Sequence, residues 1–135
     1  MRRRVNATLI ALAIATGSVM FGAPSASAAP YCDSSGYSAT NEPVERCTSL
    51  DNGILTVHQG SSGVMSTQYY KSGGSAISAK LGYSRSGTSH YASAVSISKG
   101  QTKSHSWSLG ADAYCSNIIG LMSSGSTYQT PTSHC

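Results

Sequence analysis

Residues 77–84 read ISAKLGYS, and residues 104–109 read SHSWSL. In both stretches apolar and polar side chains alternate along the chain. Successive residues of a strand point to opposite faces of its sheet, so this alternation predicts strands with one buried and one solvated face. Neither stretch has the period of 3.6 residues that marks an amphipathic helix. The two stretches therefore favour an all-β fold.

Five further runs have strand character and end at turn residues. They cover residues 54–58, 64–70, 90–98, 114–122 and 127–130. In the run 90–98, alternation is expected to place Tyr91, Val95 and Ile97 on one face. Together the runs predict a small antiparallel β-sandwich of about six to seven strands. We expect this sandwich to occupy residues 53–135.

The first 28 residues have the pattern of an export signal. Arginines at positions 2–4 precede an apolar run over residues 5–15, which small residues follow. The triplet Ala26-Ser27-Ala28 has the small-x-small form that signal peptidase accepts, so we expect cleavage after residue 28. The apolar run is too short to anchor the chain in a bilayer. The pattern predicts a secreted, extracellular protein.

The charge of the chain falls when this segment is set aside. The whole chain carries a formal net charge of +4, from nine basic and five acidic residues. Beyond residue 28, six basic and five acidic residues remain, which is a net charge of +1. Binding to nucleic acid or to an anionic membrane needs a basic surface that such a domain lacks. We therefore expect no nucleic-acid partner and no stable membrane insertion.

Four cysteines remain in the exported part, and an even number in a small exported chain indicates two disulfides. Three pairings are possible, and we favour Cys32–Cys47 with Cys115–Cys135 because both close short loops. A Cys/His metal site is the alternative, using histidines at positions 58, 90, 105 and 134. No CxxC or HxxxH spacing supports it, so we expect no metal and no cofactor.

Residues 29–52 are polar and are expected to form a loop segment closed by a disulfide. We call residues 32–47 the lasso; it carries both signs of charge. A rigid loop loses little entropy on binding, so the lasso is a candidate for protein recognition, with Tyr37 and Glu42 as contact residues. The alternative is a stabilising staple with a solvated loop. In the run 64–70, the neighbours Tyr69 and Tyr70 point to opposite faces, and they complete the set of candidate protein-binding residues.

No set of catalytic residues is evident in the sequence. It has neither a G-x-S-x-G motif nor a phosphate-binding loop. Four of the five acids lie in or beside the lasso, which does not favour the paired carboxylates of a glycosidase. Oxidised cysteines cannot act as thiol nucleophiles. We therefore expect a non-enzymatic protein that binds other secreted proteins rather than a small molecule.

The layout resembles that of small secreted proteins of actinobacteria: an arginine-rich signal, an N-terminal cysteine loop, Ser- and Gly-rich strands and a terminal cysteine. It is similar to the adaptors of umbrella-type toxin particles, in which a small β-sandwich links a large toxin chain to a lectin subunit. The segment 87–107, with SHYAS at 89–93 and Ser106-Trp107, resembles bacteriocins of the lactococcin 972 type. The likeness is one of layout and assigns no functional residues.

Three functions follow as hypotheses. The first is an adaptor or component of an extracellular assembly, such as an antibacterial toxin complex. The second is a free-standing antibacterial protein of bacteriocin type. The third is an inhibitor of extracellular hydrolases that uses the lasso as its binding loop.

Overall fold

The computed structural model describes residues 30–135, so the expected export signal lies outside the described residues. The described chain forms nine antiparallel strands in two sheets and two disulfides, and it contains no α-helix. This confirms the expected all-β sandwich. A short 3-10 turn, η1 (Ala111–Ala113), is the one helical element in this part of the chain.

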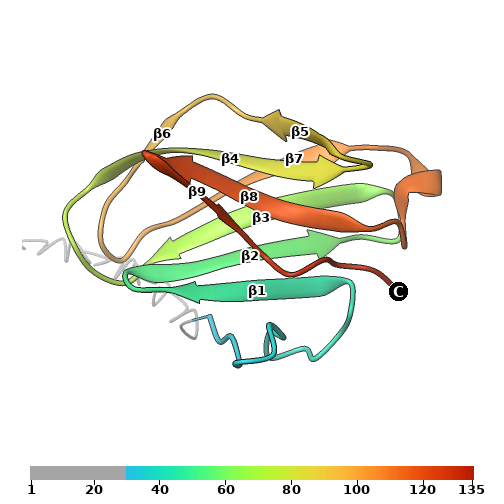
Figure 1. Ribbon diagram of the computed structural model, residues 1–135, viewed down its shortest axis with the longest axis horizontal. Helices are drawn as coiled ribbons and strands as arrows, with labels where there is room; N and C mark the ends of the chain where they lie inside the picture. Colours follow the sequence, from blue (N-terminus) through green and yellow to red (C-terminus); the bar gives the residue numbers. More distant parts are fainter. Residues whose placement is uncertain (1–29) are drawn as a thin grey trace, which may run out of the picture.

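The two sheets face each other, and each has its own strand order (Figure 1). The first sheet has the order β1-β2-β3-β7 and contains β1 (Glu45–Leu50), β2 (Gly53–Gln59), β3 (Val64–Lys71) and β7 (Thr102–Ser108). The second has the order β5-β4-β8-β9, and β6 pairs with the other end of β4. Its strands are β4 (Ile77–Arg85), β5 (Thr88–Tyr91), β6 (Val95–Ile97), β8 (Ile118–Ser124) and β9 (Ser126–Gln129).

The core lies between the sheets and is built by alternation along their strands. One cluster of buried residues comprises Leu55, Tyr69, Ala79, Leu81, Ile97 and Met122. A second comprises Val57, Met65, Tyr83 and Ile118. Every second residue of β3 is buried, so the inward row Met65, Thr67 and Tyr69 ends at Lys71. The period-2 pattern thus also carries a charged residue into the interior.

The two sheets touch closely at two points of the core. The hydroxyl of Thr67 in β3 donates a 2.8 Å hydrogen bond to the carbonyl of Gly82 in β4, which joins the sheets by a polar contact. Gly120 of β8 lies against Val57 of β2, where an added Cβ atom would be 2.8 Å from the Cβ of Val57. Glycine is therefore required at position 120 for the sheets to approach this closely.

The loop expected over residues 29–52 contains strand β1. Each residue of β1 pairs with β2, from Glu45 opposite His58 to Leu50 opposite Gly53. Its faces do not alternate in hydrophobicity, because Cys47 is the one fully buried residue of the strand. The period-2 pattern therefore could not reveal β1, and its backbone pairing holds it in place.

The strand expected over residues 90–98 is two strands, β5 and β6. Gly82 pairs with Tyr91, and continuing that register would place Ala79 opposite residue 94, but Ala79 pairs with Val95. One extra residue is thus inserted, as in a β-bulge. The prediction that Tyr91, Val95 and Ile97 share one face of a single strand is wrong. Tyr91 and Val95 are 40 % and 38 % exposed, whereas Ile97 is fully buried.

The strand expected over residues 114–122 begins only at Ile118. The residues before it form η1 and a turn in which Cys115 has a φ of 71°. Both favoured disulfides are present, with Cα–Cα distances of 5.8 Å for Cys32–Cys47 and 4.8 Å for Cys115–Cys135. The second disulfide ties the end of the chain to the turn before β8.

A buried glutamine fastens the same C-terminal segment to the sandwich. The amide nitrogen of Gln59, at the end of β2, donates to the Ser116 carbonyl at 2.8 Å and to the Ser133 hydroxyl at 2.7 Å. Its amide oxygen accepts the backbone N–H of Cys115 at 3.1 Å. Because Gln59 is only 3 % exposed, this network satisfies a polar group that would otherwise be costly to bury.

Candidate functional site

The lasso lies along the outer edge of β1, where Figure 1 shows it beside the lowest strand of the view. Tyr37 forms an antiparallel bridge with Arg46, and the N–H of Cys47 donates to the Gly36 carbonyl at 3.0 Å. The Cys32–Cys47 disulfide closes the loop over these contacts. The lasso therefore continues the sheet by one short bridge and covers this part of the edge.

Arg46 organises the lasso from within. Its guanidinium lies over the ring of Tyr37, 4.1 Å from the ring centroid. It donates to the backbone carbonyls of Gly36 and Ser35 at 2.9 Å each, and to that of Thr132 at 3.3 Å. A guanidinium with a fixed fork of donors is suited to holding several carbonyls at once. The charge of Arg46 is thus used inside the loop.

Asp33 stabilises the opposite side of the lasso. One carboxylate oxygen accepts the N–H groups of Ser35 and Tyr37, each at 2.9 Å. This is the local bonding by which aspartate fixes a turn. Asp33 and Arg46 both bond within the loop, whereas the carboxylates of Glu42 and Glu45 make no hydrogen bond within the described residues. The loop is pre-formed and presents negative charge.

The four predicted contact residues lie in different surroundings. Glu42 is exposed in the lasso, and Tyr37 is half-buried with one ring face under Arg46. Tyr70 is half-buried on the outer face of β3. Tyr69 is only 3 % exposed and packs in the core, so its ring offers little surface to a protein partner. The alternation of β3 determines which of the two neighbouring rings is buried.

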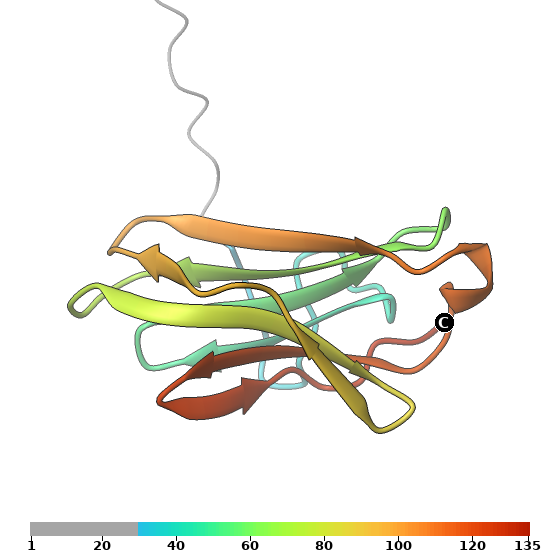
Figure 2. The ribbon, with the colours of Figure 1, turned by 90° about the horizontal axis from the view of Figure 1, so that it is seen from above.

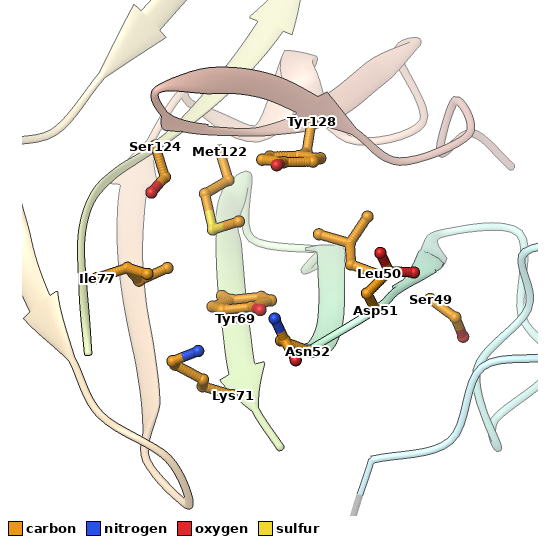
Figure 3. A pocket seen from close by; sticks show the side chains of 10 residues that line it. All are labelled: Ser49, Leu50, Asp51, Asn52, Tyr69, Lys71, Ile77, Met122, Ser124 and Tyr128. Carbon is orange, nitrogen blue, oxygen red and sulfur yellow. The ribbon is translucent and has the colours of Figure 1, made fainter. Parts of the chain in front are cut away.

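A pocket of about 360 Å³ lies at one end of the sandwich, below the β8–β9 hairpin (Figure 3). Its wall combines apolar and polar side chains: Ser49, Leu50, Asp51, Asn52, Tyr69, Lys71, Ile77, Met122, Ser124 and Tyr128. Lys71 is 1 % exposed, and its ammonium donates to the Gly73 carbonyl. No carboxylate of the described residues forms a hydrogen bond with it. Sequence reasoning missed Lys71, although the inward row of β3 contains the signal.

Tyr69 stands in this pocket with its phenol ring facing Tyr128 across the cavity (Figure 3). Burial raises the pKa of Tyr69 above its ordinary value, and the neighbouring Tyr128 raises it further. Burial has this effect because it disfavours the charged phenolate. The Tyr69 hydroxyl therefore stays protonated at neutral pH.

Four aromatic rings lie between β7 and the second sheet, at the edge opposite the lasso. The ring of Trp107 meets the ring of Tyr83 edge-on, with centroids 5.0 Å apart. The ring of His90 stacks on the same Tyr83 ring, with centroids 4.8 Å apart. His105 lies 4.6 Å from Trp107. Both histidines are exposed. These contacts hold β7 against β4 and β5 while leaving ring surface open to solvent.

No group of three or more histidine, cysteine or acidic side chains is placed to hold a metal ion within residues 30–135. In the same part of the chain, no helix has the length and hydrophobicity needed to cross a bilayer. The chain matches no protein-family model, no curated protein and no solved structure. Function is therefore inferred from the surfaces of the molecule itself.

Proposed function

We propose that the protein is an exported, non-enzymatic protein-binding module that serves as an adaptor or component of an extracellular assembly. The pre-formed lasso is the observation that carries this proposal. A disulfide, a guanidinium with three backbone carbonyl partners and an Asp33 turn hold the loop in one conformation. A partner that binds such a loop does not have to meet the entropic cost of ordering it.

The chemistry of the lasso surface favours a protein partner. The cation of Arg46 is engaged within the loop, whereas Glu42 is exposed, and Tyr31 beside the loop is 59 % exposed. Tyrosine rings are enriched at protein interfaces, and a carboxylate beside such a ring can add charge complementarity with a basic partner. A shallow pocket of about 280 Å³ also lies between the lasso and β1, lined by Asp33, Gly36 and Thr48 among others.

Two observations support an extracellular setting for this role. All four cysteines are in disulfides, which persist in oxidising compartments, and the first 28 residues have the pattern of a signal peptide. The layout resemblance to umbrella-toxin adaptors favours an antibacterial assembly. We place the protein there as a binding component rather than as the toxic subunit.

The test is capture of a partner from the culture medium of the native host. The tagged exported protein is expected to retain a secreted chain in stoichiometric amount. Arg46→Ala frees the loop, so we expect at least tenfold less capture, because a flexible loop must be ordered on binding. Arg85→Ala, at the far end of β4, is the matched control and should capture as well as the wild type. A partner-free monomer would contradict the proposal.

The rigid lasso also favours the third hypothesis, inhibition of an extracellular hydrolase, because inhibitors use pre-formed loops of this kind. The exposed Glu42 is the discriminating residue. If the protein inhibits a secreted hydrolase, Glu42→Ala should weaken inhibition at least tenfold in a panel of extracellular proteases and glycosidases. Absence of inhibition by the wild type across that panel would reject the inhibitor role.

A further inference from the structure

The first sheet has a free edge at β7. The N–H of Leu109 donates to the Gly63 carbonyl at 2.9 Å, and the N–H of Lys71 donates to the Gln101 carbonyl at 3.0 Å. Residues of an antiparallel strand alternate between facing the partner strand and facing away. The odd-numbered residues of β7 therefore bond to β3, and the even-numbered ones direct their N–H and C=O groups outward.

The outward backbone groups belong to residues 102, 104, 106 and 108. Within the described part of the chain, none of them has a backbone hydrogen-bond partner across the edge. Their side chains are one threonine and three serines, with no proline or charge among them. Figure 2 shows β7 as an outer strand with no other strand drawn beyond it, and the β5–β6 connection lies next to residues 103–105 on its inner side. An edge of this kind is a template for pairing with another strand.

The other sheet edges are protected. The lasso covers part of β1 through the Tyr37–Arg46 bridge. The edge formed by β5 and β6 is interrupted by the inserted residue between them. The fourth edge, β9, has only four residues, whereas β7 has seven. Among the strands of residues 30–135, β7 is therefore the free edge that is long enough for strand addition.

We propose that β7 binds an extended acidic segment of a partner protein, which pairs with it as a fifth strand of the first sheet. This inference rests on the proposed function and names the class of partner segment. Main-chain hydrogen bonds to the outward groups would give affinity, as in other cases of strand addition. The side chains beside the edge would give selectivity.

Charge selects an acidic segment. Lys103 lies within β7, and Lys99 lies in the turn that precedes it. Four of the five acids lie at the other edge of the sheet, in the lasso, β1 and the β1–β2 turn; the fifth, Asp112, lies in η1. A half-buried lysine on an edge strand discourages neutral or basic strands, and an acid on the incoming strand removes that penalty.

The same charge disfavours a second copy of this chain as the occupant. Pairing of β7 with β7 of another molecule would join two strands that each carry Lys103 and no acid. Neither copy would supply the carboxylate that Lys103 lacks. A partner strand with an acid near its end is therefore the better match.

A small pocket beside the edge would select the side chains of the incoming strand. It has a volume of about 60 Å³ and lies between β7 and the β5–β6 connection, where Leu81, Val95 and His105 contribute to its wall. Every second side chain of an added strand would face this side of the sheet. Lys103 also lines this pocket, so we expect the acid that meets Lys103 to lie on the same face of the segment as the side chain that enters the pocket.

The experiment uses a synthetic peptide of about nine residues, long enough to span β7. It alternates threonine with small apolar residues, carries two glutamates near one end, and is compared with a peptide in which lysines replace the glutamates. Backbone amide exchange of the complete exported protein is followed by NMR. We expect the acidic peptide to slow exchange at positions 102, 104, 106 and 108 at least tenfold. The odd-numbered amides, already bonded to β3, are the internal control.

Three variants make the result specific to the edge. Ser106→Pro removes an outward N–H and no bond to β3, so it should weaken peptide binding at least tenfold, while Ser106→Ala keeps the N–H and should bind as the wild type does. If the proline variant fails to fold, Lys103→Glu retains the backbone and should reverse the preference toward the lysine peptide. Unreversed preference in that variant would overturn the role of Lys103.

Failure of this inference is separable from failure of the proposed function. If the acidic peptide does not protect the even-numbered amides, the strand-addition inference is wrong, whether or not a partner is captured through the lasso. If those amides are already protected in the free protein and it sediments as a dimer, the edge is occupied by a second copy and the inference is also wrong. If no secreted partner is captured but the peptide binds, the adaptor function alone fails.

Discussion

A single buried ammonium shows how alternation can override the preference of a residue for solvent. Lys71 is 1 % exposed, and its ammonium donates a hydrogen bond to the backbone carbonyl of Gly73. Burying a charge without a compensating charge is costly. Methionine has a similar length and no charge, so Lys71→Met should raise the free energy of unfolding by about 1 kcal/mol. Urea denaturation measures this.

The control for this change is Lys80→Met. Lys80 is exposed in β4, so its replacement should alter the free energy of unfolding by less than about 0.5 kcal/mol. If Lys71→Met destabilises the protein instead, the ammonium contributes more through the turn it holds at Gly73 than its burial costs. Our account of Lys71 would then be wrong.

Tyr69 is expected to lower the free energy of unfolding as the pH rises into the alkaline range. Its pKa is raised in the folded protein, by burial first and by Tyr128 second, while the unfolded chain has the ordinary value of 10.0. Above pH 10 the unfolded chain loses a proton that the folded protein retains, so stability falls as pH rises. The loss is complete once pH passes the folded pKa. Below pH 10 this contribution is fully present.

We expect Tyr69→Phe to flatten this alkaline decline, as measured by urea denaturation between about pH 9 and 11. Tyr70→Phe is the matched control, because its neighbouring ring lies on the outer face of β3. A decline of equal slope in the wild type and in Tyr69→Phe would show that another group governs the alkaline transition.

At the scale of elements, the lasso combines a covalent closure with hydrogen bonds that depend on it. The Cys32–Cys47 disulfide closes a loop of 15 residues, for which chain entropy predicts about 3 kcal/mol of stabilisation. Replacing both cysteines by serine should lower the free energy of unfolding by this amount. Because β1 pairs with β2 along its full length, the β-sheet circular dichroism spectrum should persist. Loss of all sheet structure would show that pairing with β2 does not hold β1 in place without the disulfide.

The sequence predicted those elements whose burial follows their alternation. The runs 64–70, 77–84 and 104–109 correspond to β3, β4 and β7, because each has one face toward the core. Strand β1 lacks that signal, since backbone pairing and the lasso hold it. The break between β5 and β6 depends on a one-residue shift against β4, which pairing determines and hydrophobicity does not record.

The candidate sites were predictable to different degrees. Cysteine spacing predicted the disulfide-closed loop, and the sequence named Glu42 within it as a candidate contact residue. The engagement of Arg46 with Tyr37 and with three carbonyls depends on contacts that no local pattern encodes. The free edge of β7 requires the strand order, because only the topology shows which strand has one neighbour.

At the scale of the whole molecule, the two proposed binding surfaces lie at opposite edges of one sheet. The strand order β1-β2-β3-β7 places the lasso beside β1 and the free edge at β7. An adaptor must hold two partners without forcing them against each other, and this arrangement keeps the width of a four-stranded sheet between them. In the proposed adaptor, a rigid sandwich would fix the relative position of the two partners.

That rigidity depends on the close approach of the two sheets at Gly120. A Cβ atom there would lie 2.8 Å from the Cβ of Val57 and 3.2 Å from a methyl carbon of Thr130. Both neighbours are buried, so they have little room to move. Gly120→Ala should therefore force the sheets apart and lower the free energy of unfolding by about 1–3 kcal/mol, the range for overpacked cores.

The matched control is Gly73→Ala in the β3–β4 turn. An added Cβ at that position would meet only an oxygen of Asn52, at 3.4 Å, which is ordinary contact. This change should leave stability within about 0.5 kcal/mol of the wild type. Equal stability of Gly120→Ala and Gly73→Ala in urea would show that the sheets can separate without cost. The sandwich would then be too compliant to hold two partners at a fixed distance, and the adaptor geometry would lose its physical basis.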